Sequence, residues 1–195
     1  MSPYLPPARI RLATTEDMAA VAAIYAPVVE HTAISLEEVP PDAAAMERRR
    51  ARFAADGLPW LVAVEGDEVL GYAYAAPYNE RAAYRWTVSA SVYLAEAARG
   101  RGLGRQLYTE LFALLKAQGY RSVWAGIGLP NEPSVRLHEG MGFVQVGLYP
   151  AAGFKHGAWC DVGSWRLELG QPDGPPAEPR PVEEVWHVNT TPTRT

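Results

Sequence analysis

The sequence predicts an α/β (α+β) fold in which helices pack on one mixed β-sheet. Short apolar segments of strand length alternate with amphipathic segments of helical periodicity, which indicates a layered domain. Two apolar runs, residues 60–65 and 69–76, meet at Gly66-Asp67, a pair typical of an antiparallel hairpin turn. Residues 86–127 hold a strand, a glycine-rich turn, a long helix and another strand, which is a crossover between parallel strands.

The first half of the chain is expected to hold one strand and two helices before that hairpin. Residues 9–13 have the pattern of a short strand. Thr14 and Asp17 have the spacing of a capping box that starts a first helix, and Asp42 is a suitable cap for a second. The buried faces predicted for the two helices consist of Met18, Val21, Ala22, Tyr25, Met46 and Phe53.

The second half is expected to continue with strands around two further helices. A long helix begins at Gly102 and ends at Gly119, and a short one precedes Gly142, because glycine favours the backbone conformation that ends helices. Strands are predicted over residues 86–94, 122–127, 143–148 and 162–169. The residues assigned to the core here are Leu107, Leu111, Leu114, Leu115, Trp86, Trp124 and Trp159.

Composition excludes several classes of protein. The chain has 195 residues, 48% of them hydrophobic, which is enough for one core. A net charge of -4 offers no broad basic surface for nucleic acid or an anionic membrane. Cys160 is the single cysteine, so neither an internal disulfide nor a cysteine-based metal site is expected. Without a signal-peptide pattern or a long apolar run, the sequence predicts a cytoplasmic protein that holds no metal.

Three regions differ in composition. Residues 1–8 are Pro-rich and are predicted to be an irregular N-terminus, and residues 9–169 form a single domain. Residues 170–195 are rich in Pro and Thr, and a segment with so few apolar residues is predicted to be a flexible tail. The alternative is that Val185 and Trp186 dock on the domain or on a partner subunit.

The turn at residues 99–104 lies between a strand and the long helix, where sheets of this kind bind ligands. Gly100, Gly102 and Gly104 carry no Cβ, so their backbone N–H groups can approach a ligand closely. The helix that starts there adds the positive end of its dipole, and two arginines add charge, which favours a pyrophosphate. A plain tight turn is the alternative. The pattern lacks the Lys-Ser/Thr of a phosphate-binding loop and the GxGxxG spacing of dinucleotide-binding proteins.

Two motifs resemble those of a known superfamily. Arg-x-x-Gly-x-Gly at residues 99–104 is similar to the acetyl-CoA signature of the GNAT N-acetyltransferases. Residues 131–143 resemble the later motif of that superfamily, an Asn-led helix that ends in Gly-Phe. The resemblance implies an acetyltransferase (GNAT-like) fold with a mixed, mostly antiparallel central sheet flanked by helices.

Longer strings resemble one family within that superfamily, the phosphinothricin N-acetyltransferases. These strings are residues 84–87, 127–131, 134–139, 151–157 and 161–163, and the resemblance covers about residues 10–169. It implies transfer of an acetyl group from acetyl-CoA to the amino group of small amino-acid analogues such as phosphinothricin and methionine sulfoximine. Family members are often homodimers, so the resemblance also implies a homodimer.

The resemblance assigns roles on the side of the site that would hold acetyl-CoA. His138 stands where many superfamily members have a tyrosine that protonates the CoA thiolate, and imidazole can hold a proton near neutral pH. A structural histidine is the alternative. Asn131 would contact the pantetheine arm, although an N-cap role is compatible with its position. The remaining residues implied in acetyl-CoA binding are Val92, Tyr93, Leu94, Arg99, Gly100, Arg101, Gly102, Leu103, Gly104 and Arg105.

On the acceptor side the sequence departs from the family. The family carries a glutamate within Trp-Thr-x-Glu as the base that deprotonates the amine, and this chain has Ser89 there, which has no useful basicity. Cys160 replaces a histidine of close relatives and is interpreted as a small buried residue. Tyr84 matches a position that lines the substrate pocket, and Arg81 can pair with a carboxylate or phosphinate. Residues 32–36 resemble the loop that covers that pocket.

Several explanations of the missing glutamate stay open. A water chain can deprotonate the amine, with Glu37, Glu38 or His138 as the base. The acceptor can instead be a different, less basic amine, or catalysis can be weak.

The alternatives to a small-molecule enzyme are an acetyltransferase for protein N-termini, which needs a wide groove, and a non-catalytic domain that binds acyl-CoA.

Overall fold

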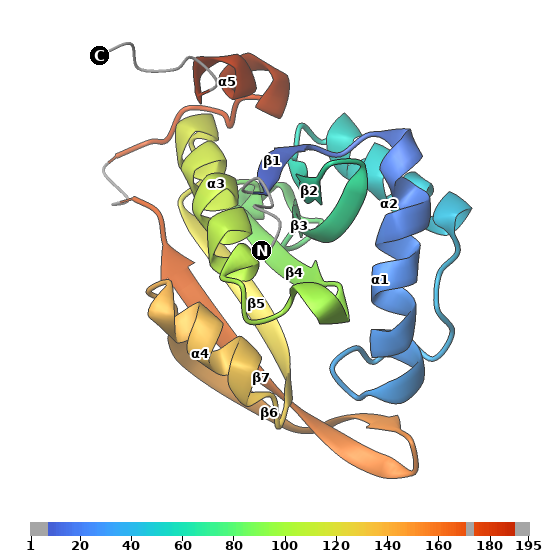
Figure 1. Ribbon diagram of the computed structural model, residues 1–195. Coiled ribbons are helices and arrows are strands. Elements are labelled where there is room, and N and C mark those ends of the chain that lie inside the picture. The colour runs from blue at the N-terminus through green and yellow to red at the C-terminus, as the bar shows by residue number, and fades with distance from the viewer. Residues whose placement is uncertain (1–7, 171–173, 190–195) are drawn as a thin grey trace.

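The computed structural model describes residues 8–170 and 174–189, with side chains as far as residue 186. In this part of the chain seven strands form one sheet, in the order β1-β2-β3-β4-β5-β7-β6, with helices on both faces (Figure 1). The elements in chain order are β1 (Arg9–Leu12), α1 (Met18–His31), α2 (Ala43–Ala55), β2 (Trp60–Glu65), β3 (Glu68–Pro77), β4 (Thr87–Leu94), α3 (Leu103–Gln118), β5 (Ser122–Leu129), α4 (Glu132–Gly140), β6 (Val144–Lys155), β7 (Ala158–Glu168) and α5 (Val182–Asn189).

The strand pairings confirm the predicted sheet. β4 and β5 are parallel, and the other neighbouring strands are antiparallel. The last two strands are longer than predicted and form a hairpin that turns at His156-Gly157. Pairing within this hairpin shifts between Tyr149 and Gly153, and Ala151 has φ +49°. That irregularity interrupts the strand pattern in the sequence, which explains why the extension was not predicted.

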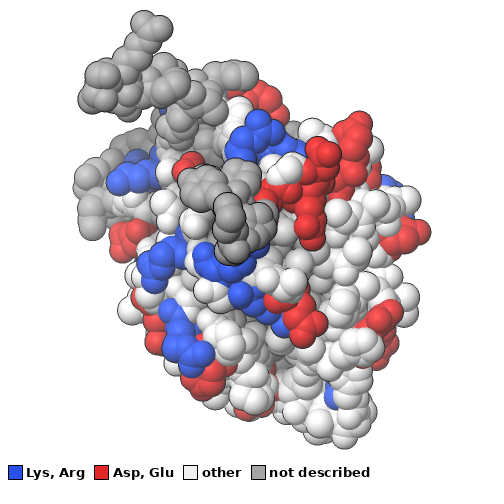
Figure 2. All heavy atoms as spheres, viewed as in Figure 1, with Lys and Arg blue, Asp and Glu red and all other residues white. Residues whose placement is uncertain are grey.

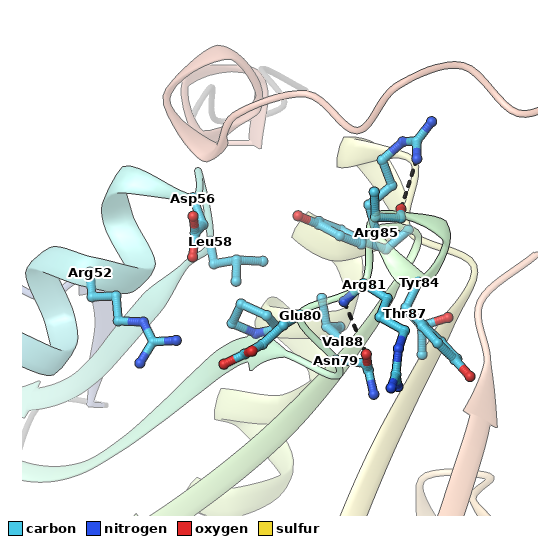
Figure 3. A pocket seen from close by; sticks show the side chains of 13 residues that line it. Arg52, Asp56, Leu58, Asn79, Glu80, Arg81, Tyr84, Arg85, Thr87 and Val88 are labelled. Atoms are coloured by element: carbon cyan, nitrogen blue, oxygen red, sulfur yellow. Dashed lines mark hydrogen bonds between the residues drawn. The ribbon is translucent and has the colours of Figure 1, made fainter.

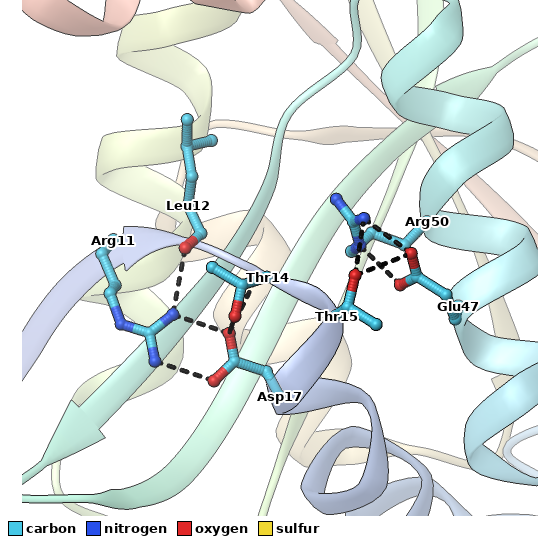
Figure 4. A network of polar contacts seen from close by, with 7 residues as sticks. All are labelled: Arg11, Leu12, Thr14, Thr15, Asp17, Glu47 and Arg50. Atoms are coloured by element: carbon cyan, nitrogen blue, oxygen red, sulfur yellow. Dashed lines mark hydrogen bonds and ion pairs between the residues drawn. The ribbon is translucent and has the colours of Figure 1, made fainter.

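Local sequence signals set the element boundaries. Asp42 caps α2, with its Oδ1 accepting a hydrogen bond from the N–H of Ala45 at 2.7 Å. At the start of α1 the Thr14 N–H donates to Asp17 Oδ2 at 2.7 Å, and Arg11 pairs with the same carboxylate (Figure 4). Gly119 ends α3 with φ +99°. These predicted signals are confirmed because each acts within one turn of chain.

The sheet separates two hydrophobic cores. One lies under α3 and holds the predicted helix face together with alternate residues of β4, β5 and β7. The other lies under α1 and α2 and is rich in aromatic side chains from β2, β3 and β4. The prediction of a core position for Trp159 is wrong, because 68% of its surface is exposed on the β6–β7 hairpin. Trp86 and Trp124 are half-buried.

The C-terminal segment differs from the predicted flexible tail. Residues 182–189 form α5, which packs on α3 and buries Val182 and Val185 in the core under that helix. Gln118 at the end of α3 donates to the carbonyl oxygens of Gly57 and Arg180, at 2.7 and 2.8 Å. The docking alternative holds for Val185 and, in part, for the half-buried Trp186. Residues 171–173 and 190–195 of the predicted tail, and residues 1–7 of the predicted N-terminus, lie outside the described residues.

The surface carries charges of both signs. On the face shown in Figure 2, basic side chains gather mainly left of centre and a group of acidic side chains lies in the upper right. Within residues 8–170 and 174–189, no helix combines the length and the apolar character that crossing a membrane requires.

Candidate active site

The sheet splits between its two parallel strands. β4 and β5 pair only from Thr87–Ser89 to Ser122–Trp124, although β4 continues to Leu94 and β5 to Leu129. On its other side β4 stays paired with β3 as far as Leu94. Residues 90–94 therefore present a strand edge to an opening, where an extended ligand can take the place of a neighbouring strand.

A groove of about 310 Å³ follows this opening. Its walls come from β4, from the glycine turn and from the start of α4, and they include seven of the residues expected to bind acetyl-CoA: Val92, Tyr93, Leu94, Arg99, Gly100, Gly104 and Asn131. Asn131 also caps α4, since its Oδ1 accepts a hydrogen bond from the Ser134 N–H at 3.3 Å. The structure thus brings these seven of the eleven residues expected to bind acetyl-CoA together at one site.

Two glycines of the turn have the left-handed backbone conformation. Gly100 and Gly102 have φ of +75° and +79°, a conformation that favours glycine, and a Cβ at either position would meet no atom within 4 Å. Gly102 is the N-cap of α3 and offers no side chain to its first amides. Those amides are consequently available to an anion.

The arginines of the turn do not act alike. Arg99 lines the groove. Arg101 pairs with Glu65 at 2.7 Å, and Arg105 donates to the carbonyl oxygen of Gly140 at 3.0 Å, outside the groove. Arg101 and Arg105, which the resemblance implied in acetyl-CoA binding, are thus held by other parts of the chain, and their part in acetyl-CoA binding stays a prediction.

His138 lies at the narrow end of the opening, where a cavity of about 50 Å³ is also lined by Ser91 and Tyr108. Its Nδ1 is 2.8 Å from the carbonyl oxygen of Ser134, which can only accept a hydrogen bond, so Nδ1 carries the proton. Its Nε2 then accepts from the Tyr108 hydroxyl at 3.0 Å. Burial lowers the pKa of His138 below its ordinary value of 6.5, which keeps the ring neutral at pH 7.

Ser89 faces the opposite side of the sheet from α3. Its neighbours Val88 and Ala90 belong to the core under α3, so Ser89 and Ser91 point to the face that α1 and α2 partly cover. Ser89 Oγ donates to the carbonyl oxygen of Ala76 at 3.3 Å. Ser89, where the resemblance implies a glutamate, belongs to the last pair of β4 and β5 and so lies beside the point at which these strands separate.

Arg81 and Tyr84 line a different cavity, of about 360 Å³, at the other end of β4 (Figure 3). Tyr84 contacts Tyr78, with ring centroids 5.7 Å apart, and the Arg81 backbone N–H donates to Asn79 Oδ1. Neither residue lines the groove beside the glycine turn. Cys160 is buried, and its Sγ faces the carbonyl oxygen of Ala158 in its own hairpin, which agrees with a small buried residue.

The loop at residues 32–36 lies across β5 and β6. A Cβ on Gly128 would be 2.7 Å from the carbonyl oxygen of Ala33, and one on Gly153 would be 2.6 Å from a methyl of Leu36. The buried Lys155 ammonium donates to the carbonyl oxygens of Val29 and Ser35 at 2.6 and 2.7 Å, which fixes the loop. Lys155 is therefore a structural residue.

Of the two glutamates considered as bases, Glu37 is already engaged. Arg49 donates to both of its carboxylate oxygens, at 2.8 and 2.7 Å, and Tyr25 donates to one of them. The pKa of Glu37 is lowered, chiefly by the hydrogen bonds from Arg49. A carboxylate held in this way is a poor base. Glu38 is exposed.

Sequence reasoning missed Tyr108. It lies between Leu107 and Leu111 in the chain, so its spacing marks it as part of the buried face of α3. Its partner His138 is 30 residues away, and the sequence holds no local signal that joins the two.

A split between parallel strands, with a glycine turn at the wide end and a buried histidine at the narrow end, defines an acyltransferase that uses a CoA thioester. The chain belongs to the acetyltransferase (GNAT) family, whose pattern matches residues 26–143.

Within this family, the chain is similar to proteins that are named as acetyltransferases of amino-acid analogues. The chain is 43% identical to a phosphinothricin N-acetyltransferase of Streptomyces viridochromogenes, over 96% of this chain and 100% of the relative. It is 35% identical to an L-methionine sulfoximine/L-methionine sulfone acetyltransferase of Salmonella typhimurium, over 86% and 98%. It also resembles the crystal structure of a phosphinothricin acetyltransferase from Sinorhizobium meliloti in complex with AcCoA, with TM-score 0.85, 37% identity and coverage of 89% and 95%.

Proposed function

We propose that this protein transfers the acetyl group of acetyl-CoA to the amino group of a small amino-acid-like acceptor of the phosphinothricin or methionine sulfoximine type. The observation that carries the proposal is the opening between β4 and β5, with the uncapped start of α3 at one end and the Tyr108–His138 pair at the other. The names of the relatives supply the class of acceptor.

The groove residues fit acetyl-CoA. In this proposal the backbone of Val92, Tyr93 and Leu94 holds the pantetheine arm, the amides of residues 100–104 hold the pyrophosphate, and Asn131 contacts the arm from the α4 side. Bound acetyl-CoA supplies an activated acetyl thioester, whose sulfur leaves as a thiolate that needs a proton. The unpaired edge of β4 is the observation that supports this fit.

His138 serves in this proposal as both base and acid, through Tyr108. When the acceptor amine loses a proton, by way of a water in the 50 Å³ cavity, the Tyr108 oxygen accepts it while the Tyr108 hydrogen moves to His138 Nε2. The ring is then an imidazolium whose Nδ1–H stays bonded to the Ser134 carbonyl oxygen. The same path in reverse delivers the proton to the leaving sulfur. A neutral histidine is suited to this role because its lowered pKa leaves Nε2 unprotonated.

The acceptor occupies, in this proposal, the sheet face that carries Ser89. Arg81 binds its carboxylate and Tyr84 lines its pocket, as the family resemblance implies. Cys160 contributes shape rather than charge, in keeping with its burial. Because Ser89 cannot hold the acceptor ammonium or its water as a carboxylate would, turnover of phosphinothricin is expected to be slower than in relatives with glutamate there.

Thiol release tests the function. The purified protein is mixed with acetyl-CoA and, in turn, phosphinothricin, methionine sulfoximine and methionine sulfone, and free CoA thiol is measured with a chromogenic disulfide. We expect release with at least one amino acid and none with its N-acetylated form. Binding of acetyl-CoA by calorimetry without release for any amine would contradict the proposal and favour a non-catalytic acyl-CoA-binding domain.

We also propose a cytoplasmic homodimer. The free thiol of Cys160 suits a reducing compartment. β6 is an edge strand, and the β6–β7 hairpin exposes apolar side chains that favour a second copy as partner: Val144, Val146, Leu148, Tyr149, Phe154 and Trp159. Sedimentation equilibrium would give twice the 21.3 kDa chain mass for a dimer, and a single chain mass at micromolar concentration would contradict it.

A further inference from the structure

Three residues form a row across the sheet on the face that carries Ser89. Ser89 of β4 pairs with Trp124 of β5, and Trp124 pairs with Arg166 of β7. Their chain neighbours Val88, Val123 and Trp165 all belong to the core under α3. Because successive side chains of a strand point to opposite faces, the row points away from that core.

Two aromatic contacts link the row to Tyr84, which lines the proposed acceptor pocket. The Trp124 ring stacks on Tyr78, with centroids 5.0 Å apart, and Tyr78 contacts Tyr84. On this face α1 and α2 pack on β2, β3 and β4, which leaves the side chains of Trp124 and Arg166 only half-buried. An aromatic surface therefore leads from Tyr84 to a guanidinium group.

The charge of Arg166 is weakly compensated. Its Nη1 is 3.9 Å from Glu168 Oε2, at the limit of an ion pair, and the two side chains are 39% and 43% exposed. Arg49 and Arg101, by contrast, hold their carboxylates at 2.7 Å. The Arg166 guanidinium consequently keeps N–H groups that an anion can reach.

The spacing suits an amino acid with an anionic side chain. Neighbouring strands lie about 4.8 Å apart, so Ser89 and Arg166 are separated by about 10 Å across the row. An α-amino acid whose amine lies near Ser89 can extend its methylene groups along the row, past Trp124, toward the guanidinium. With no carboxylate at Ser89, the row has a net positive charge.

We infer that Arg166 is a specificity-determining residue that binds the anionic end of the acceptor side chain. The inference rests on the proposed function and adds to it a preference for acceptors with a negatively charged side chain over neutral ones of similar length. Phosphinothricin, with its phosphinate, belongs to the first group, and methionine sulfone belongs to the second.

The test compares these two acceptors in Arg166→Gln, which removes the charge at similar size. We expect KM for phosphinothricin to rise roughly tenfold, as for loss of a charged hydrogen bond, while KM for methionine sulfone stays within about twofold. Arg166→Lys should restore part of the preference. Glu168→Gln is the matched control, because it alters the weak ion pair and leaves the guanidinium in place.

Equal changes for the two acceptors in Arg166→Gln, or no change in either, would overturn the inference. Calorimetric binding of each acceptor to the CoA-loaded protein gives a readout that needs no turnover. A tenfold loss of affinity confined to phosphinothricin supports the inference, and an unchanged affinity overturns it. If the unmodified protein turned over neither compound, the proposed function would fail, and the binding comparison would still decide the role of Arg166.

Discussion

The two halves of the site are built from different parts of the chain. The half that faces the glycine turn consists mainly of backbone: two glycines with positive φ, an uncapped helix start and a strand edge without a partner. The acceptor half, as proposed, consists of side chains from separate strands and loops, among them Ser89, Trp124, Arg166 and Tyr84. A site made of backbone groups keeps its geometry only if its glycines are not substituted. A site made of side chains can change by substitution without destabilising the fold.

That difference explains where this chain departs from its relatives. The glycine turn matches the family signature, and its geometry leaves little freedom for other residues. Ser89 lies on a strand whose pairing with β3 and β5 does not depend on its side chain, so a glutamate can be lost there while the fold remains. Substitutions in the half that faces the glycine turn should accordingly change the affinity for acetyl-CoA. Substitutions in the acceptor half should change kcat/KM for the acceptor.

The largest effect is expected at the junction of the two halves. His138→Gln should lower kcat by about 10² to 10³-fold, because it removes the group proposed to take and return the proton. In the unmodified protein kcat should fall only as pH drops below 6.5, through the lowered pKa of His138, and this acid limb should vanish in the variant. A pH profile of thiol release would show both. An unchanged acid limb in the variant would assign it to another group.

A side chain added in the glycine turn should weaken acetyl-CoA binding by the donor half, which is the half of the site that faces this turn. Gly100→Val should weaken acetyl-CoA binding by roughly thirtyfold and leave acceptor KM nearly unchanged, because the branched side chain disturbs the amides around the pyrophosphate. Gly157→Val is a matched control, since Gly157 has φ +77°, close to +75° at Gly100, and open space around its Cβ. Both should lose about 1–2 kcal/mol of stability. Equal acetyl-CoA affinity in the two variants, by calorimetry, would argue against the turn as the binding site.

Restoring the carboxylate should act only on the acceptor half. Ser89→Glu should raise kcat/KM for phosphinothricin by about tenfold, because a carboxylate beside the end of the β4–β5 pairing can hold the ammonium and its water. Ser89→Gln provides the same size without charge and should give no gain. Steady-state kinetics at saturating acetyl-CoA separates these outcomes. A gain in the glutamine variant would point to shape rather than charge.

The smallest effect on activity is expected from the C-terminal helix, which lies outside both halves. Val185→Ala should lower the free energy of unfolding by about 1–3 kcal/mol, because it leaves a cavity beside α3, and kcat/KM should stay within about twofold. Glu184→Ala, at the exposed neighbouring position, should leave stability within about 0.5 kcal/mol. Urea unfolding followed by tryptophan fluorescence measures both. Identical midpoints would show that α5 is not docked in solution.

The sequence alone determined the features that act over one turn of chain. The capping box of Thr14 and Asp17, the cap at Asp42, the glycines of the turn and the leucine face of α3 depend on contacts between residues three or four apart, or on one residue's own φ. Such signals are visible without a fold, because their partners are close in the chain. The family motifs could likewise be recognised as strings.

Only the tertiary structure decided the long-range pairs. In the folded chain Tyr108 is hydrogen-bonded to His138, and Arg101 forms an ion pair with Glu65. Helix α5 packs on α3, although the composition of residues 170–195 predicted a flexible tail. The tertiary structure also set Ser89, Trp124 and Arg166 in one row, which depends on strand register rather than on spacing in the sequence. Burial and register belong to the whole sheet, so no local pattern could have specified them.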